Sequence, residues 1–282
     1  MINIKNKTYL IFLLTLLLIL TTISLTINKY STKEVNKQNQ DLKNILEKQK
    51  NYNKKYLSRY INYYNNNNNL PLEQIIIHVN IGIDEPFYSN IKKTKNLNTI
   101  NILVNKYHYL PNDYIPNNLE ELNTDYALPG MKLVKEAKDA FESMASDAKA
   151  ENLTIMAMST YRSYEYQKNL YSNYVEKDGI EKADTYSARP GHSEHQTALA
   201  IDIYNKEKNY TEFESTKEFK WMQENAYKYG FILRYPKYKT NITGYQYEPW
   251  HYRYVGKDSA EFIHKNDLTY EEYFYQYIKK WA

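Results

Sequence analysis

The sequence predicts an α+β domain that follows an N-terminal membrane segment. Three observations support this prediction. A run of about twenty residues without a charge begins at Thr8 and is long enough to cross a membrane. From Tyr126 onward, amphipathic helical patterns alternate with short strand patterns. These patterns lack the regular spacing of repeated βαβ units, which argues against a doubly wound parallel sheet.

Composition limits the chemistry that the 282 residues can perform. Hydrophobic residues make up 42% of the chain, enough for the core of one catalytic domain with a small accessory region. Cysteine is absent, so disulfides, thiolate metal sites and cysteine nucleophiles are excluded. A metal must therefore be held by His, Asp or Glu. The net charge of +4 is mild and no basic run is interleaved with aromatics, so we expect no nucleic-acid partner.

Residues 8–27 form the predicted membrane segment. At about 1.5 Å per residue, a helix of this length spans a hydrocarbon core roughly 30 Å thick. The segment has no good small-x-small cleavage site, so we expect an uncleaved anchor rather than a cleaved signal peptide. Lys5 and Lys7 favour a cytoplasmic tail at residues 1–7 and an external body, although lysines also follow the run.

The next two regions are expected to be a stalk at 28–69 and an accessory region at 70–125. The stalk is rich in Lys, Asn and Gln, and its interrupted heptads fit a solvated helix better than a coiled coil. Its asparagine run at 65–69 reads as a loop. A stalk that binds anionic wall polymers or lipid headgroups is the alternative to a plain spacer. In the accessory region, the isoleucines at 75–77 suit either a helix or a strand.

The main domain is expected at 126–282. Its apolar periodicity and its Gly stops predict the elements in chain order. Helices are predicted at 130–152, 163–179 and 215–230, and strands within 153–163 and at 199–204 and 231–236, followed by a strand-like segment at 245–256.

The stretch "GHSEHQTALAIDIY", residues 191–204, contains candidate metal ligands. Apolar residues alternate with period two along 199–204, which places Asp202 on the face opposite the isoleucines of a strand. A buried acid without a partner is costly, so Asp202 needs a partner or water. His195, across a polar turn, could share a metal with it. A solvated loop histidine near an edge-strand aspartate explains this stretch equally well.

A second segment, "YEPWHYRYVG", strengthens the metal hypothesis. It places Glu248 three residues before His251, and Pro249 pushes Glu248 into extended geometry. The segment is therefore unlike the helical H-E-x-x-H of zincins. A catalytic zinc takes three protein ligands and leaves one place for water. His195, Asp202 and His251 could supply those ligands, which leaves Glu248 as the base.

The two segments together resemble a known family. "SEHQTALAID" is similar to S-x-H-x-x-G-x-A-x-D and "EPWH" to E-x-W-H, the paired signatures of VanY-type zinc D-alanyl-D-alanine carboxypeptidases, relatives of the VanX dipeptidases. "STYRSYEYQ" and "GFILRYP" look like the same family, and the resemblance covers roughly residues 101–256. It implies the zinc DD-peptidase, or Hedgehog-like, fold: a small, mostly antiparallel sheet flanked by helices.

The resemblance also implies roles for individual residues. It makes His195, Asp202 and His251 the zinc ligands and Glu248 the catalytic base. Arg162 matches the family arginine that faces the scissile carbonyl, where its guanidinium suits an oxyanion or a substrate carboxylate. The alternative for Arg162 is a surface salt bridge.

Two further residues are candidate substrate contacts. Ser193 matches the family serine next to the first ligand and could instead be a turn-forming hydroxyl. Gln167 could instead be a solvated residue on a helix surface. His192 is expected to be a loop residue, and Glu194 leaves the role of base to Glu248.

The chain departs from the family pattern at two glycines. Ala198 stands where the family usually has Gly, and Thr160 stands where Gly often precedes the Tyr-Arg pair. If position 198 requires a positive φ, alanine costs about 1 kcal/mol there. If the family glycine only allows close packing, a methyl group is tolerated.

The function implied by the resemblance is that of a metallopeptidase hydrolase that removes the C-terminal D-alanine from peptidoglycan stem peptides. We expect a single-pass protein of the bacterial cell membrane with an extracytoplasmic catalytic domain and a Zn²⁺ cofactor. An L,D-carboxypeptidase acting on tetrapeptide stems is one alternative. A non-catalytic wall-binding module with a degenerate site is another.

Overall fold

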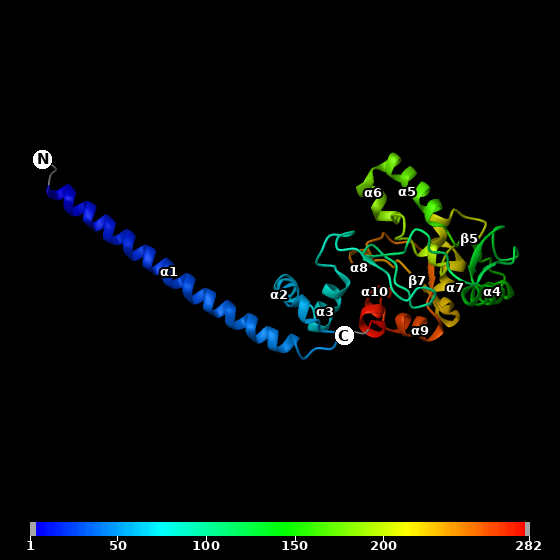
Figure 1. Cartoon of the computed structure of the whole chain (residues 1–282), viewed down its shortest axis with the longest axis horizontal. Helices are drawn as coiled ribbons and strands as arrows, with labels where there is room; N and C mark the ends of the chain where they lie inside the picture. The colour runs from blue at the N-terminus through cyan, green and yellow to red at the C-terminus, as the bar shows by residue number, and fades with distance from the viewer. Residues whose placement is uncertain (1–3, 280–282) are drawn as a thin grey trace. The chain divides into compact units, whose positions relative to one another are not determined.

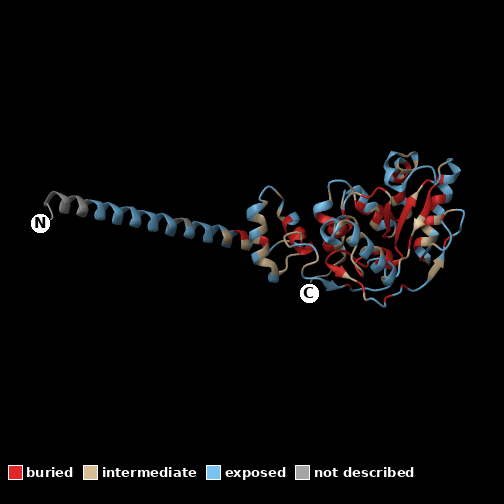
Figure 2. Cartoon of the chain, turned by 90° about the horizontal axis from the view of Figure 1, so that it is seen from above, coloured by how far each residue is buried: buried red, intermediate tan, exposed pale blue. Residues whose placement is uncertain are grey.

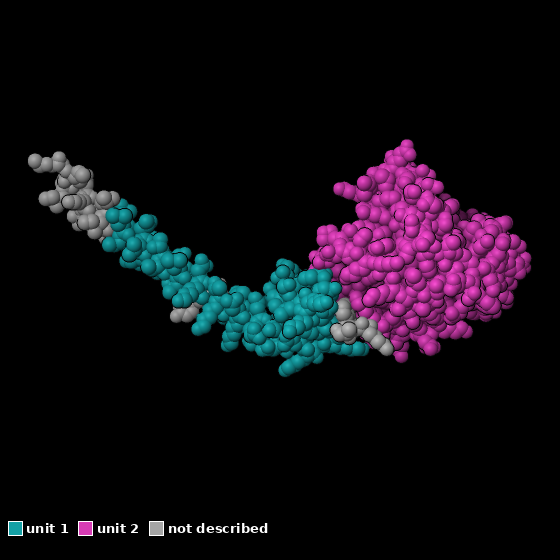
Figure 3. All heavy atoms as spheres, viewed as in Figure 1, with its two compact units in different colours: residues 1–76 teal, residues 77–282 magenta. Residues whose placement is uncertain are grey.

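The computed structural model describes residues 4–279, drawn in Figure 1. The chain forms two compact units that meet in the sequence between Ile76 and Ile77, coloured separately in Figure 3.

The first unit is helical. Its elements are α1 (Ile4–Leu46), η1 (Lys54–Tyr56) and α2 (Leu57–Asn66). The helix α1 contains the predicted membrane segment and continues into the predicted stalk, and its side chains at 13–29 are all exposed (Figure 2). By length and composition this helix can cross a membrane. A signal sequence near the N-terminus meets the same two criteria. The end of α1 contacts α2, where Tyr60 is fully buried.

The helix α3 (Leu72–Ile81) runs across the boundary between the units. It resolves the ambiguity of the isoleucines at 75–77, which lie in this helix and not in a strand. All three are buried, so their apolar character reflects packing and not β structure.

The second unit is built on a four-stranded antiparallel sheet. Its spatial order is β5 (Met156–Ser159), β6 (Ala200–Tyr204), β8 (His251–Tyr254) and β7 (Phe231–Leu233). Two small sheets accompany it: β3 (Leu119–Glu121) pairs antiparallel with β4 (Lys132–Val134), and β1 (Lys92–Lys93) pairs parallel with β2 (His108–Tyr109). The predicted small, mostly antiparallel sheet is confirmed.

Helices flank this sheet. In chain order they are α4 (Lys135–Ala150), α5 (Tyr164–Asp178), α6 (Ile180–Tyr186), η2 (Glu194–Thr197), η3 (Tyr210–Ser215), α7 (Lys217–Asn225), η4 (Ala226–Tyr229), α8 (Thr240–Thr243), α9 (Lys257–Lys265), α10 (Tyr270–Tyr273) and η5 (Phe274–Ile278). The main core lies where α4 packs on the sheet, and Phe141 meets Phe231 there edge to face. Ile102, Val104, Leu110, Tyr114 and Leu122 contribute to the same core. Figure 2 colours the buried residues of the chain red.

Two of the predicted helices change at their ends. The helix predicted at 130–152 begins only at Lys135, because Lys132–Val134 pair with Leu119–Glu121 as β4. The pattern at 215–230 divides into α7 and η4, and Gly230 closes it at φ +88°. The helix predicted at 163–179 is confirmed as α5, with Ser163 as its N-cap and Gly179 as its C-cap.

Candidate metal centre

The central strands of the sheet bring two predicted ligands together. In the antiparallel register of β6 and β8, Asp202 lies directly opposite His251. The third residue, His195, comes from the single turn η2 that precedes β6. All three side chains are buried, and one potential ligand atom from each lies within 4.8 Å of the others. A loop and two adjoining strands thus form one compact group, as the sequence predicts.

Each imidazole of this group has a defined orientation. His195 Nδ1 donates to the carbonyl of Thr160 at 2.6 Å, which leaves Nε2 directed at Asp202 Oδ2, 3.3 Å away. His251 Nδ1 lies 3.0 Å from Asp202 Oδ1. The two rings are nearly perpendicular, with centroids 5.0 Å apart. A carboxylate therefore lies between two ring nitrogens of different histidines.

This donor set fits a zinc ion. Two imidazoles and one carboxylate form a ligand set of catalytic zinc sites. Among the described residues, His251 Nε2 is a buried nitrogen without a hydrogen-bond partner, so this ring has one nitrogen toward Asp202 and an unsatisfied one behind it. A metal-bound histidine binds the ion through one ring nitrogen and donates the N–H of the other to an outer partner.

Burial and nearby charges keep His195 in the neutral form that can bind a metal. Burial, with help from Arg162, lowers the pKa of His195 to about 4, so its imidazole is neutral, the form that a metal requires. Burial alone would raise the pKa of Asp202, but His195 and Arg162 outweigh it and hold that pKa well below its usual value. For His251, Asp202 and Glu194 outweigh burial and raise the pKa to about 9.

Glu248 lies beside this group without belonging to it. Its backbone N–H donates to the carbonyl of Tyr235 at 3.2 Å, and its carboxylate Oε2 lies 3.8 Å from His251 Nδ1. Burial raises the pKa of Glu248 to about 8; Asp202 adds to this effect, while His251 and Arg162 oppose it. A carboxyl group that can gain and lose a proton near neutral pH suits a general base that later acts as an acid.

Arg162 contacts the candidate ligands directly. Its Nη2 lies 2.5 Å from Asp202 Oδ2, and its Nε donates to Ser159 Oγ at 2.9 Å. The partner Asp202 is buried, so the alternative of a surface salt bridge is wrong. The guanidinium therefore lies beside the candidate ligands.

One cavity of about 110 Å³ collects the predicted site residues. All seven line it: Arg162, Gln167, Ser193, His195, Asp202, Glu248 and His251. Gln167 is not the solvated helix residue of the alternative hypothesis. It is buried, and its Nε2 donates to the carbonyl of Ala188 at 2.8 Å.

Several features of this site are not evident from the sequence. The wall of the cavity includes Tyr174, Tyr186, Tyr235 and Tyr245, which nothing distinguishes in a chain with 32 tyrosines. His192, expected to be a loop residue, is buried outside the cavity lining, and its Nδ1 lies 2.8 Å from the carbonyl of Asn105. Glu194 directly precedes His195 in the chain, and this adjacency is the sequence signal that places its carboxylate near the candidate ligands.

The two departures from the glycine pattern have different consequences. Ala198 adopts the left-handed conformation, with φ 54° and ψ 29°, so the conformational penalty of alanine applies. Thr160 is well accommodated, because its carbonyl accepts from His195 and its hydroxyl accepts from the backbone N–H of Lys132 at 2.8 Å.

Comparison with known proteins identifies the family. The sequence profile of VanY, described as D-alanyl-D-alanine carboxypeptidase, matches residues 130–257. YodJ of Bacillus subtilis (strain 168) is 46% identical over 212 residues, which cover 71% of this chain and 77% of YodJ. The chain belongs to the VanY family. As a member of this family it is a carboxypeptidase, and the predicted resemblance is confirmed.

Solved structures support the fold of this VanY-family member. The LdcB LD-carboxypeptidase matches with a TM-score of 0.63 and 45% identity, over 67% of this chain and 91% of LdcB. A vancomycin resistance D,D-pentapeptidase VanY, solved in complex with Zn(II), matches with a TM-score of 0.53 and 34% identity, over 61% of this chain and 97% of its own. The small sheet with its flanking helices is therefore the fold of the VanY zinc peptidases.

Proposed function

We propose that this protein is a zinc carboxypeptidase that removes the C-terminal D-alanine from peptidoglycan stem peptides. The observation that carries the proposal is the buried group of His195, Asp202 and His251 in one cavity with Glu248. The matching VanY structure holds Zn(II), and the LdcB structure concerns peptidoglycan recognition. Both similarities support the metal and the substrate class.

Each site residue has a separate role in the proposed reaction. His195, Asp202 and His251 would hold the zinc ion, which would supply Lewis acidity for the scissile carbonyl and the attacking water. Glu248 takes a proton from that water and later gives a proton to the nitrogen of the leaving D-alanine. Arg162 pairs with negative charge on the substrate oxygen atoms.

Ser193 and Gln167 complete the proposed substrate site. Both line the cavity, and both are buried. Gln167 Oε1 has no hydrogen-bond partner within the described residues, so a donor on the substrate can satisfy it.

The scissile bond has two candidates. The sequence motifs predict a D,D-carboxypeptidase, which cuts between the two D-alanines of a pentapeptide stem. An L,D-carboxypeptidase, which acts on tetrapeptide stems, is the second candidate. It is favoured by a specific observation: identity to the LdcB LD-carboxypeptidase is 45%, against 34% to the VanY D,D-pentapeptidase. A non-catalytic wall-binding module is disfavoured, because the ligand group and Glu248 are both intact.

The proposed location follows from α1. We infer a single-pass anchor at 8–27, with a cytoplasmic tail before it and a stalk at 28–69 after it, in the bacterial cell membrane. The accessory region at 70–125 and the catalytic domain at 126–282 then lie outside the cytoplasm, beside the wall. The apolar composition of α1 and the exposure of its side chains at 13–29 support the anchor; a cleaved signal is the alternative.

A product assay tests this proposal. The zinc-loaded full chain in detergent is incubated separately with pentapeptide and tetrapeptide stems, and released D-alanine is measured. Release from the pentapeptide supports D,D specificity, and release from the tetrapeptide alone supports L,D specificity. Glu248→Gln should lower either rate by about 10²–10⁴-fold while zinc remains bound. Zinc binding without release from either peptide would leave the wall-binding module as the function.

A further inference from the structure

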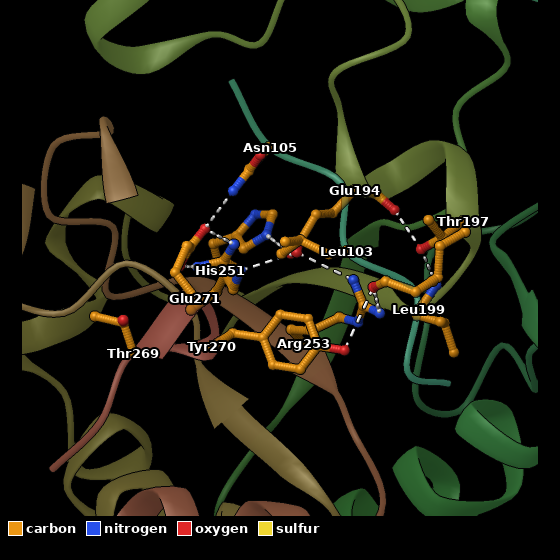
Figure 4. A network of polar contacts seen from close by, with 12 residues as sticks. Leu103, Asn105, Glu194, Thr197, Leu199, His251, Arg253, Thr269, Tyr270 and Glu271 are labelled. Atoms are coloured by element: carbon orange, nitrogen blue, oxygen red, sulfur yellow. Dashed lines mark hydrogen bonds and ion pairs between the residues drawn. The ribbon is translucent and has the colours of Figure 1, made fainter. Parts of the chain in front are cut away.

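Glu194 belongs to the lining of the cavity, and its buried carboxylate lies on the Nε2 side of His251. Its side chain is completely buried. Oε1 accepts from Arg234 Nε at 2.9 Å and lies 3.0 Å from Arg253 Nη1. Oε2 lies 3.9 Å from His251 Nε2, and within the described residues neither of these two atoms has a hydrogen-bond partner (Figure 4). An acceptor and a potential donor thus face each other about 1 Å beyond hydrogen-bonding distance.

Arg234 is held from the side opposite Glu194. Its Nη1 and Nη2 donate to Glu271 Oε2 and Oε1 at 2.8 and 2.5 Å, a bidentate pair. Glu271 Oε1 also accepts from Asn105 Nδ2 at 3.2 Å (Figure 4). All four of these side chains are buried. The guanidinium that holds Glu194 is therefore fixed by a second carboxylate.

Arg253 holds Glu194 from the adjoining strand β8. Its Nη2 donates to the carbonyl of Ile102 at 2.9 Å, and its Nε donates to the carbonyl of Tyr254 at 2.9 Å. Two guanidinium groups and two carboxylates thus share one buried cluster without net charge. Buried ion pairs of this kind contribute little net stability compared with apolar packing. Stability alone does not explain why such a cluster contacts His251.

The chemistry of His251 indicates what the cluster does. The nitrogen that faces Asp202 and Glu248 is Nδ1, at 3.0 and 3.8 Å. A metal bound through Nδ1 requires this nitrogen to be unprotonated, so the neutral ring carries its proton on Nε2. A carboxylate that accepts this N–H fixes the tautomer and raises the basicity of the ligating nitrogen. Glu194 Oε2 is in position to do so.

We propose that Glu194 is a positioning residue for the metal ligand His251. Its Oε2 accepts the Nε2–H of His251, while Arg234 and Arg253 hold Oε1 and so fix the carboxylate. This inference rests on the proposed metal centre. It gives a function to a buried carboxylate that is not one of the three candidate metal ligands.

The test compares zinc affinity between isosteric variants of the full chain in detergent. Glu194→Gln turns an amide toward the Nε2–H and should weaken zinc binding about 10–100-fold in competition with a chelator. The visible absorption of the Co²⁺-substituted protein should shift as well, which general loss of stability would not cause. Glu271→Gln is the matched control. It removes the same charge from the same cluster but leaves Arg234 Nε and Arg253 beside Glu194, so it should change the zinc affinity and the Co²⁺ spectrum much less than Glu194→Gln does.

Glu194→Asp provides a second variant if the glutamine variant fails to fold. Aspartate keeps the charge beside Arg234 and Arg253 but withdraws the carboxylate from His251, so zinc binding should again weaken. An unchanged zinc affinity and an unchanged Co²⁺ spectrum in the Glu194 variants would overturn this inference but not the proposed function. Failure of the unaltered chain to bind zinc would overturn the proposed function itself.

Discussion

At the residue scale, Ala198 shows how a departure from a motif acquires a physical meaning. The motif alone leaves open whether the family glycine provides conformational freedom or space. The structure decides for conformation, because Ala198 has a φ of 54° immediately after the turn that carries His195. An alanine in this region pays for contact between its Cβ and the neighbouring carbonyl oxygen.

Ala198→Gly should therefore stabilise the fold. We expect the free energy of unfolding to rise by about 1 kcal/mol, equivalent to a midpoint about 2–4 °C higher for a unit of this size. The measurement is thermal or denaturant unfolding of the zinc-free protein. Ala200→Gly is the control, since Ala200 lies in β6 with ordinary strand geometry and glycine should destabilise it. Equal destabilisation by both substitutions would contradict the conformational explanation.

Individual site residues differ in how far the sequence could predict them. His195, Asp202, His251 and Glu248 were predictable because their motifs and their spacing imply one chemistry. The position of the Glu194 carboxylate could not be predicted, because it depends on contacts with Arg234 and His251, which are both distant in the chain.

At the scale of elements, local sequence signals predict the presence of a helix well and the residues at which it begins and ends less well. The helix α5 keeps its predicted limits because both caps are local: Ser163 accepts from the backbone of Tyr166, and Gly179 adopts a φ of 80°. The start of α4 was displaced because β4 pairs with β3, a contact that the periodicity of residues 130–152 does not encode.

The cap of α5 should also matter for substrate binding. Ser163→Ala removes the cap and should cost about 1 kcal/mol. Because α5 carries Gln167 into the cavity, we expect KM for the stem peptide to rise. Thr216→Ala removes the corresponding cap of α7, which places no residue in the cavity lining, and should leave KM unchanged. Steady-state kinetics of the two variants, with unfolding curves for each, separate the two effects; equal KM values would contradict a role for α5 in binding.

At the scale of the whole molecule, the proposed topology joins a membrane helix to a cleft that acts on the wall. An enzyme that trims stem peptides benefits from being held close to them, and α1 offers about twenty uncharged, mostly apolar residues for this purpose. The same helix could have been removed as a signal, so topology requires its own test.

The anchor predicts how the protein partitions in cells. The full chain should remain in the membrane fraction after washing with high salt and should be released by detergent, because burial of apolar surface is insensitive to ionic screening. A chain without residues 1–27 but with a cleavable export signal should appear in the soluble extracytoplasmic fraction. Fractionation with detection of the intact N-terminus measures this. A full chain recovered without its first residues and free of membranes would contradict the anchor.

The most direct test of the account is the metal dependence of D-alanine release by the full chain. The protein is stripped with a chelator, zinc is added back in steps, and bound zinc and released D-alanine are measured on the same samples. We predict that the stripped protein is inactive and that activity rises with zinc until one ion is bound per chain. His251→Ala should abolish both quantities together. Full D-alanine release by the zinc-free protein would contradict the central claim that His195, Asp202 and His251 form a catalytic zinc site.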